Sequence, residues 1–503
     1  MMRYSMLVYI TKMGRTLLEA AQYLRTAPAG DPLRQELLEN GRQMLAQIED
    51  VLEQHRDDLR SEAPLDCLSE IEALWNSCGE GLEKHLGQLV QDLPGQVFYQ
   101  VRAVFFAELG EKWDAMESVY EYMRDDPRFD PIVVRTPVGR VVERNGKREQ
   151  EIIYKDFLTP MGIPSLGYDE YNIEADCPEL AFISQPYESC TLEQFWPENI
   201  AEHTRLVYLP YFMQDFYDNE DIFPLAKMPV YHYAWKVACP NQNQYRFYCR
   251  YAKNRGSNAL LTGLPKLDPL VSLQTRGAEL PCGWEKIKGK TVFLWNTWYS
   301  FDISSIQYLP QILEWFRMHP DCALIWREHP MTKVVTKLHF PEQYPHYKEM
   351  CAEARKVENV IIDGNLSFHA AFYWSNALIS DYSSLISQYL LMDKPTLWII
   401  SRLNRYVNDA NAKTFIDDRW LEKTKGADGI FDFLDRVRNG IDSNGELRKQ
   451  IRQRDLPLAD GHCAERVSDA VWLAMHSEDG LPTKERTEKN ECKNRLDKTV
   501  SSS

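Results

Sequence analysis

Between residues 291 and 400, short apolar segments alternate with amphipathic segments of helical period, and this alternation restricts the possible fold more than any other feature. It is typical of parallel α/β units, in which each strand is followed by a crossover helix. Strands are predicted at 291–295, 323–327, 360–362, 377–379 and 396–400. Helices are predicted near 305–318, 342–356, 368–374 and 384–392.

The same alternation occurs earlier in the chain, with strands predicted at 97–106, 130–135, 180–184, 205–210, 233–238 and 259–262. The charged segment 141–155 predicts a hairpin or a loop. We therefore expect two Rossmann-like lobes, an N-terminal one over 96–280 and a C-terminal one over 290–476. The Gly- and Pro-containing stretch 277–289 is the expected linker.

The two ends of the chain differ from the lobes. Residues 1–95 form a helical region, because apolar residues recur at helical spacing between 17 and 93 with almost no glycine, and two to four helices are predicted. This region could pack on the lobes or make a homo-oligomer contact. The charged stretch 477–503 ends in three serines and predicts a disordered tail.

Composition excludes several classes of function. The 503 residues include 74 acidic and 58 basic side chains, for a net charge of −16, which argues against a nucleic-acid partner. No window reaches the roughly 20 apolar residues of a membrane-spanning helix. Lys12 and Arg15 interrupt the apolar start too early for a secretory signal, so we expect a cytoplasmic protein with, at most, peripheral membrane contact. The eleven cysteines lack zinc spacing, and neither a metal nor another cofactor is predicted.

The segment from Ala377 to Met392 is an apolar strand that turns through Asp381, Ser383 and Ser384 into a helix. The free N–H groups of a helix's first turn, its dipole and two hydroxyls can all bind a phosphate. In open α/β sheets, ligands bind at this edge, beyond the carboxyl ends of the strands. The alternative is that Asp381 or a serine only caps the helix.

A second buried strand ends in Arg327, Glu328 and His329 before a proline. Arg327 could neutralise phosphate charge, and His329 could donate a hydrogen bond or transfer a proton near neutral pH. The alternative is an ordinary loop histidine. Another strand presents Asn296 and Thr297 at its end, toward the same expected cleft.

The turn of Gly263, Pro265 and Asp268 follows the last strand of the first lobe, near the expected hinge. A purely structural turn would also explain Gly263 and Pro265.

Taken in order, these segments resemble the CDP-glycerol glycerophosphotransferase family, the teichoic-acid primases and polymerases. The matching motifs are Gly263-Leu-Pro-Lys-Leu-Asp268, Asn296-Thr-Trp298, Glu328-His-Pro330 and Asp381-Tyr-Ser-Ser384, followed by Asp393-Lys-Pro395. The resemblance covers residues 97–400 and implies a GT-B fold with a CDP-linked donor in the second lobe. It implies that His329 contacts the donor phosphates or assists departure of CMP, and that Ser383 and Ser384 hold the pyrophosphate. The other donor-side residues are Arg327, Asp363, Asp381, Asn296 and Thr297.

The chain departs from the family in the first lobe, where a Trp-His-Gly segment usually supplies the base for the acceptor hydroxyl. The comparable strand here is Leu206-Val-Tyr-Leu-Pro-Tyr-Phe212, without a histidine. Candidates nearby in sequence are His203, Asp215 and His232. The first loop offers Glu108, Lys112 and Trp113 as residues that could meet the acceptor.

The resemblance favours a transferase that moves glycerol phosphate or a related alditol phosphate from a CDP-linked donor to a cell-surface glycan or lipid-linked acceptor. Two alternatives stay open: a GT-B glycosyltransferase using a UDP- or GDP-sugar, and an inactive relative that kept only the nucleotide pocket. A lipid-linked acceptor would bring the protein to the inner face of the cell membrane.

Overall fold

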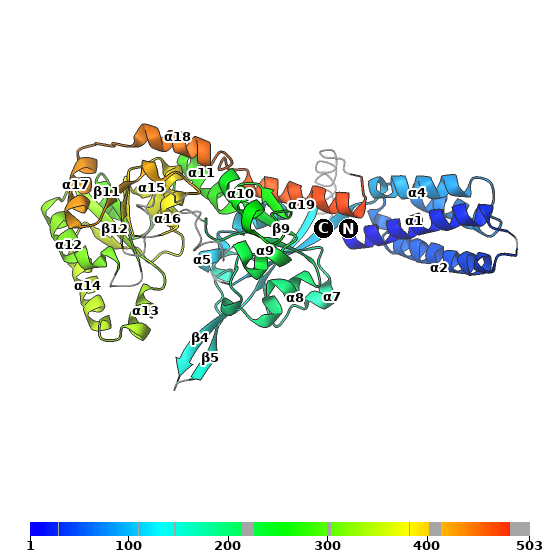
Figure 1. Ribbon diagram of the computed structural model, residues 1–503, viewed down its shortest axis with the longest axis horizontal. Coiled ribbons are helices and arrows are strands. Elements are labelled where there is room, and N and C mark those ends of the chain that lie inside the picture. Colours follow the sequence, from blue (N-terminus) through cyan, green and yellow to red (C-terminus); the bar gives the residue numbers. More distant parts are fainter. Residues whose placement is uncertain are drawn as a thin grey trace.

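The computed structural model is an elongated molecule with a bundle of helices at one end, a first α/β lobe in the middle and a second α/β lobe at the other end (Figure 1). The structure describes residues 1–28, 30–108, 110–144, 147–213, 226–298, 303–381, 383–401 and 414–482. Two parallel sheets and an added helical region confirm the predicted fold class.

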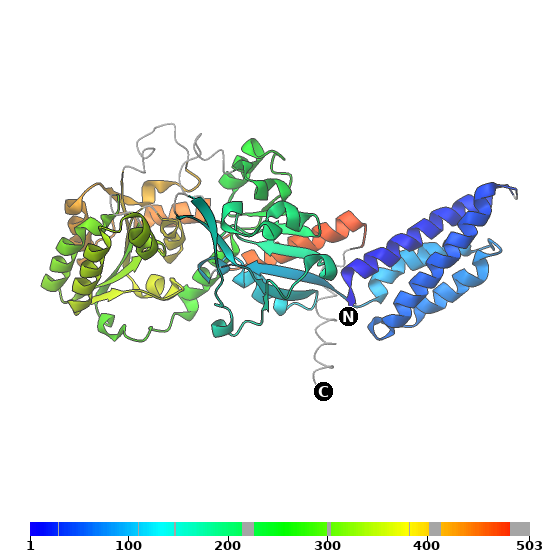
Figure 2. The same cartoon turned by 90° about the horizontal axis from the view of Figure 1, so that it is seen from below.

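The N-terminal bundle consists of α1 (Tyr4–Thr26), α2 (Pro32–Gln54), α3 (Ala63–Trp75) and α4 (Leu82–Gln96), and it projects away from the lobes (Figure 2). Trp75 is completely buried between these helices. Its indole N–H donates to the backbone oxygen of Leu38 at 3.0 Å. A Cβ at position 41 would overlap the indole ring, so Gly41 allows α2 to approach Trp75 closely.

The first lobe is built on a parallel sheet in the order β10-β9-β8-β7-β2-β3-β6, to which β1 adds by pairing with β2. Its central strand, β2, is buried on both faces, as expected of a parallel sheet between helices. The strands are β1 (Met2–Arg3), β2 (Tyr99–Ala107), β3 (Phe129–Arg135), β6 (Leu166–Gly167), β7 (Leu180–Ile183), β8 (Arg205–Tyr208), β9 (Lys236–Cys239) and β10 (Ala259–Leu261).

Two predictions for this lobe have clear outcomes. The charged segment after β3 forms an antiparallel hairpin of β4 (Val138–Arg144) and β5 (Lys147–Ile153), which confirms the hairpin alternative. The strand predicted at 233–238 is wrong in its first part, because α9 (Pro229–Tyr233) extends to Tyr233 and β9 begins only at Lys236. A proline at the first helical position favours this helix start.

The second lobe is built on a parallel sheet in the order β13-β12-β11-β14-β15-β16. Its strands are β11 (Thr291–Thr297), β12 (Cys322–Glu328), β13 (Val360–Ile362), β14 (Ala377–Ser380), β15 (Thr396–Ile399) and β16 (Glu422–Thr424). The strand order reverses between β11 and β14. In open α/β sheets, ligands bind beyond the carboxyl ends of the strands at such a reversal.

Helices cover both sheets. Those of the first lobe are α5 (Gly110–Trp113), α6 (Glu117–Arg124), α7 (Ile173–Asp176), α8 (Pro197–Ala201), α9 and α10 (Gln242–Tyr251). Those of the second lobe and the connections are α11 (Asp268–Arg276), α12 (Leu309–Met318), α13 (Thr332–His339), α14 (Tyr344–Lys356), α15 (His369–Trp374), α16 (Leu385–Tyr389), α17 (Ala427–Arg438), α18 (Gly445–Asp455) and α19 (Cys463–Asp479). Among the described helices, none has the length and apolarity needed to cross a bilayer.

The chain crosses between the lobes twice, which corrects the predicted boundaries. Leu270 and Leu273 of α11, assigned by sequence to the first lobe, pack in the core of the second. Val467 and Val471 of α19, assigned to the second lobe, pack in the core shared by the first lobe and the bundle. Helix α19 continues to Asp479, past the predicted start of the tail, and residues 483–503 lie outside the described part.

Candidate functional site

The register of the second sheet aligns the ends of its central strands. Asn296 on β11 is paired with Arg327 on β12 and with Ser380 on β14. On the outer side, Trp326 of β12 is paired with Ile362 of β13. Because all four strands are parallel, the residues that follow them meet at one edge, where the sequence predicted a donor site.

Asn296 and Thr297 are buried and bind neighbouring strands. The side-chain amide of Asn296 donates to the backbone oxygen of Arg327 at 3.1 Å, and its oxygen accepts from the hydroxyl of Ser380 at 3.2 Å. The Thr297 hydroxyl accepts from the indole N–H of Trp326 at 3.2 Å. These two side chains therefore hold the strand ends together rather than pointing into open space.

Asp381 anchors the chain that follows β11. Its carboxylate accepts from the backbone N–H of Trp298 at 2.8 Å and from both the hydroxyl of Ser304 and the backbone N–H of Ser305, at 2.8 and 2.9 Å. Burial raises the pKa of this carboxyl, while these donors oppose the shift. Asp381, predicted on the donor side, thus accepts internal donors and positions the loop.

Arg327 and Asp363 form an ion pair of 2.6 Å across the ends of β12 and β13. The same guanidinium donates to the backbone oxygens of Asn365 and Leu366 at 2.9 and 3.0 Å. Asp363 also accepts from the backbone N–H and the side-chain amide of Asn365. The pair therefore shapes the loop after β13.

His329 lies at this edge in a defined orientation. Its Nδ1 accepts a hydrogen bond of 3.1 Å from the backbone N–H of Met331, and its ring centroid lies 5.3 Å from that of Trp298. Burial lowers the pKa of His329 to about 4, so the imidazole is neutral at pH 7. A neutral ring that accepts at Nδ1 carries its proton at Nε2, and Nε2–H is a hydrogen-bond donor.

Ser383 and Ser384 precede α16, as predicted, but the helix is shorter than expected. It covers Leu385–Tyr389 and continues as the 3₁₀ turn Leu390–Met392. The Ser383 hydroxyl accepts from the backbone N–H of Leu385 at 3.2 Å, which is a capping contact. Both serines are half-buried, and Tyr382 between them and Asp381 lies outside the described residues.

Sequence reasoning missed His369, which begins α15 after the Asp363 loop. Burial lowers the pKa of His369 to about 4, with added effects from the cations Arg276, Lys266 and Arg327. These cations come from the connection between the lobes and from β12, so His369 lies where the lobes meet. Its position just after a strand end was the signal that could have found it.

Gly263 and Asp268 connect the first lobe to α19. Gly263 has φ +81°, a conformation that favours glycine, and a Cβ there would approach Sγ of Cys463 to 2.5 Å. Both the backbone conformation and the lack of space therefore require glycine. Asp268 accepts from the backbone N–H groups of Cys463 and Ala464 at 3.0 and 2.8 Å. Pro265 accepts at its backbone oxygen from the hydroxyl of Ser118. The turn predicted near the hinge thus connects α6 of the first lobe, through Ser118, with the start of α19.

In the first lobe, Glu108 follows β2 at the carboxyl edge. It accepts from the ammonium of Lys112 at 3.3 Å and from the amide of Gln185 at 3.0 Å. Burial raises the pKa of Glu108, and Lys112 opposes that shift. Trp113 is only 1% exposed in the core, so the prediction that it meets the acceptor is wrong.

The structure places the alternative bases away from this edge. His203 precedes β8, and His232 precedes β9, so both lie at the amino ends of their strands. His203 is 3.7 Å from a carboxylate oxygen of Glu174, and His232 lies beside Lys253. Asp215 lies outside the described residues.

The lobes approach each other at the same edge. A Cβ at Gly110, which follows Glu108 in the first lobe, would approach the side chain of Leu366 in the second lobe to 2.7 Å. The Leu366 backbone oxygen in turn accepts from Arg327. Within the described residues, no cluster of His, Cys, Asp and Glu side chains is arranged to hold a metal ion.

Comparison with known proteins identifies relatives. The teichoic acid ribitol-phosphate polymerase TarL of Staphylococcus aureus is 22% identical over 249 residues, which cover 46% of this chain and 40% of that protein. The chain thus matches only about two fifths of the length of this relative.

Solved structures share the fold. A variant of the wall teichoic acid polymerase TagF soaked with CDPG superimposes with a TM-score of 0.50 and 13% identity, over 83% of this chain and 98% of that one. A protein described as a UDP-N-acetylglucosamine 2-epimerase, from Listeria monocytogenes, also gives a TM-score of 0.50, with 11% identity over 75% of this chain and 97% of that one. At these identities the likeness concerns the fold alone.

Residues 225–473 match the family described as CDP-glycerol:poly(glycerophosphate) glycerophosphotransferase. That range contains the second lobe and every donor-side residue predicted from the sequence. Over these residues the chain is similar to the CDP-glycerol:poly(glycerophosphate) glycerophosphotransferase family.

Proposed function

We propose that this protein transfers an alditol phosphate, such as glycerol phosphate, from a CDP-linked donor to a hydroxyl of a glycan or polymer acceptor. The observation that carries this proposal is the family match over residues 225–473, which includes His329 and the strand ends around it. The relative TarL, a ribitol-phosphate polymerase, supports the chemical class.

The reaction forms one bond and breaks one bond. The acceptor oxygen attacks the phosphorus next to the alditol, and the bond from that phosphorus to the bridging oxygen breaks. CMP leaves with the electron pair, and the acceptor proton passes to a base. Positioning and neutralisation of phosphate charge provide most of the catalysis in such transfers.

On the donor side, we assign His329 to the phosphates. Its Nε2–H can donate to the bridging oxygen, and a dianionic diphosphate beside the ring would raise the pKa of His329, which burial lowers. Ser383 and Ser384 offer hydroxyls at the same edge. Arg327, Asp363 and Asp381 act as positioning residues, because their groups already bind neighbouring loops.

On the acceptor side, we assign the base to Glu108. It lies at the carboxyl end of β2, beside the point where Gly110 meets Leu366 of the donor lobe. Burial raises the pKa of its carboxyl, which makes the carboxylate a stronger base, and Lys112 and Gln185 fix its orientation. A lipid-linked acceptor, peripheral membrane contact and oligomerisation through the N-terminal helices stay predictions.

The test is release of nucleotide from CDP-glycerol, CDP-ribitol, UDP-N-acetylglucosamine and GDP-mannose in the presence of a glycerol-phosphate oligomer as acceptor. We expect CMP release from a CDP-alditol, and a loss of at least about 100-fold in kcat for Glu108→Gln with unchanged donor affinity. Release of UDP or GDP instead would support the sugar-transferase alternative. Donor binding without release would support the inactive relative.

A further inference from the structure

A cavity lies at the amino edge of the donor-lobe sheet, opposite the edge of the proposed donor site. It has a volume of about 570 Å³ and is lined by the segment before and at the start of β11, the end of α15, the turn before β15 and one residue of α18. Asn296 lies toward the other end of β11, and Asp381 directly follows the other end of β14. The cavity is therefore distinct from the proposed donor site.

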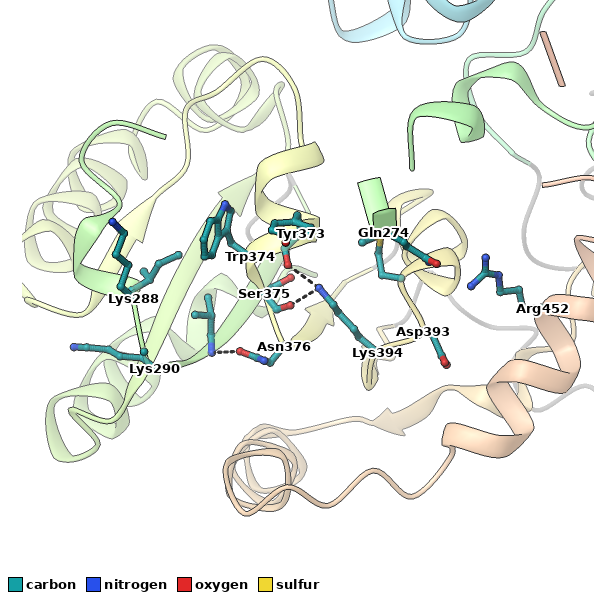
Figure 3. A pocket seen from close by; sticks show the side chains of 14 residues that line it. Gln274, Lys288, Lys290, Tyr373, Trp374, Ser375, Asn376, Asp393, Lys394 and Arg452 are labelled. Atoms are coloured by element: carbon teal, nitrogen blue, oxygen red, sulfur yellow. Dashed lines mark hydrogen bonds between the residues drawn. The ribbon is translucent and has the colours of Figure 1, made fainter. Parts of the chain in front are cut away.

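Positive charge dominates its lining. Lys288, Lys290, Lys394 and Arg452 contribute four cationic groups, and Asp393 contributes the one carboxylate among the lining residues. Figure 3 shows Lys288 and Lys290 at one end, Arg452 at the other, and Lys394 between them. In a protein with a net charge of −16, this local excess of cations is unusual.

Lys394 is half-buried, and its ammonium has no counter-ion among the described residues. It donates to the backbone oxygens of Phe372, Tyr373 and Ser375 at 2.8, 2.8 and 2.6 Å. These carbonyls lie at the C-terminal end of α15, so they satisfy the hydrogen bonds of the ammonium but supply only partial negative charge. Desolvation lowers the pKa of Lys394 to about 8, and a nearby anion would stabilise its charged form.

Arg452, like Lys394, donates to a backbone oxygen and has a pKa lowered by burial. Its guanidinium donates to the backbone oxygen of Leu391 at 3.0 Å, and burial lowers its pKa, an effect that Asp393 opposes. Asp393 is itself engaged by Arg448, with a distance of 3.0 Å between Nε and Oδ1. Asp393 therefore neutralises the charge of Arg448 as well as opposing the effect of burial on Arg452.

Lys288 and Lys290 provide charge that faces solvent. Lys288 is exposed and Lys290 is half-buried, and neither forms an ion pair with a described residue. Lys290 also contributes, after burial, to lowering the pKa of the neighbouring Lys286. Tyr373 and Trp374 line the cavity between the two cationic ends and offer apolar surface.

We propose that this cavity binds phosphodiester groups of an alditol-phosphate polymer. The inference rests on the proposed function, because such a polymer is the product of that reaction. Cations at both ends match successive negative charges, and the aromatic side chains between them suit the carbon chain of an alditol. A polymer held at the amino edge would stay attached while its end reacts at the carboxyl edge.

The test compares Lys288→Glu/Lys290→Glu and Arg452→Gln with the control Lys84→Glu/Lys348→Glu, which changes two exposed lysines of α4 and α14. Binding of a defined glycerol-phosphate oligomer is measured by titration calorimetry at low and high salt, with inorganic phosphate as a competing arm. We expect each cavity variant to bind the oligomer at least tenfold more weakly, the control to bind it as the wild type does, and thermal stabilisation by CDP-glycerol to be unchanged.

Equal binding by the wild type and both cavity variants would overturn the inference, and so would an equal loss in the control. Oligomer binding no tighter than that of inorganic phosphate would assign the cavity to the free ion and overturn the polymer assignment. The assay needs no turnover. A protein that binds the oligomer through these residues but releases no CMP would contradict the proposed function and leave the polymer site standing.

Discussion

The carboxylate of Asp268 accepts a hydrogen bond of 3.0 Å from the backbone N–H of Cys463, 195 positions later in the sequence. A second bond, from the N–H of Ala464, completes a helix cap that α19 receives from a distant segment. His462, the residue before α19, provides no side-chain cap of its own. One side chain thus joins the start of α11 to the start of α19.

Replacing Asp268 with alanine should lower the free energy of unfolding by about 1 to 2 kcal/mol, the usual cost of losing a helix cap. Chemical denaturation followed by circular dichroism measures this change. Glu465→Ala is the matched control, because Glu465 lies in the same first turn but its side chain is 43% exposed. A similar loss in both variants would show that the cap is not responsible.

Replacing Asp381 with asparagine should weaken donor binding and lower the free energy of unfolding by about 1 to 3 kcal/mol. The amide would turn an NH₂ group toward donors from Trp298, Ser304 and Ser305 that now meet a carboxylate. Calorimetry with CDP-glycerol and urea denaturation check the two effects. Asp432→Asn, at an exposed position of α17, should change neither; donor binding that survives in Asp381→Asn would contradict the positioning role.

Replacing His329 with alanine should reduce kcat for CMP release by about 100-fold or more, in the range seen for loss of a group that assists proton transfer. Steady-state kinetics with CDP-glycerol provide the measurement. His339→Ala serves as the control, because His339 is an exposed histidine at the end of α13. Full activity in His329→Ala would remove this residue from the proposed mechanism.

Buried His476 should make the protein less stable in mild acid. Its Nδ1–H donates to the backbone oxygen of Trp472 at 2.8 Å, and its Nε2 accepts from the hydroxyl of Tyr99 at 2.8 Å. Burial lowers the pKa of His476 to about 4, whereas an unfolded histidine titrates near 6.5. Between these values the unfolded state binds more protons, so stability falls as pH decreases from 6.5 to 4.

Urea denaturation of the wild type and His476→Gln at several pH values tests this linkage. We expect the variant to be less stable at pH 7 and to lose less stability between pH 6.5 and 4, because one of the titrating groups is gone. Identical pH dependence in the two proteins would exclude His476 as a source of the acid sensitivity.

The sequence predicted β11 to β15 of the second lobe well, because apolar residues mark buried segments and these strands are mostly buried. The half-exposed β16 was not predicted. Asn296, Arg327, His329 and Asp381 were expected at one edge because each lies at the carboxyl end of a predicted strand, and the family resemblance added Asp363. What periodicity does not encode is the direction of a side chain after the strand ends. Arg327 therefore binds a loop where a phosphate contact was expected, and Asp381 holds the chain after β11.

Long-range contacts account for the remaining differences. Nothing near Cys463 in the sequence indicates that α19 returns to the first lobe, because the residues with which it shares a core lie far earlier in the chain. Glu108 was a candidate from its loop, but its partner Gln185 follows a different strand. His369 escaped notice because the cations around it come from separate elements.

The return of α19 to the first lobe also affects how the protein is made. Val467, Val471 and Met475 belong to the core that the first lobe shares with the N-terminal bundle. During translation, the first lobe is synthesised long before α19. The apolar surface that α19 covers therefore stays exposed until the second lobe and this helix have been synthesised. A nascent chain arrested before residue 463 should therefore engage chaperones, and completion of the final helix should release it.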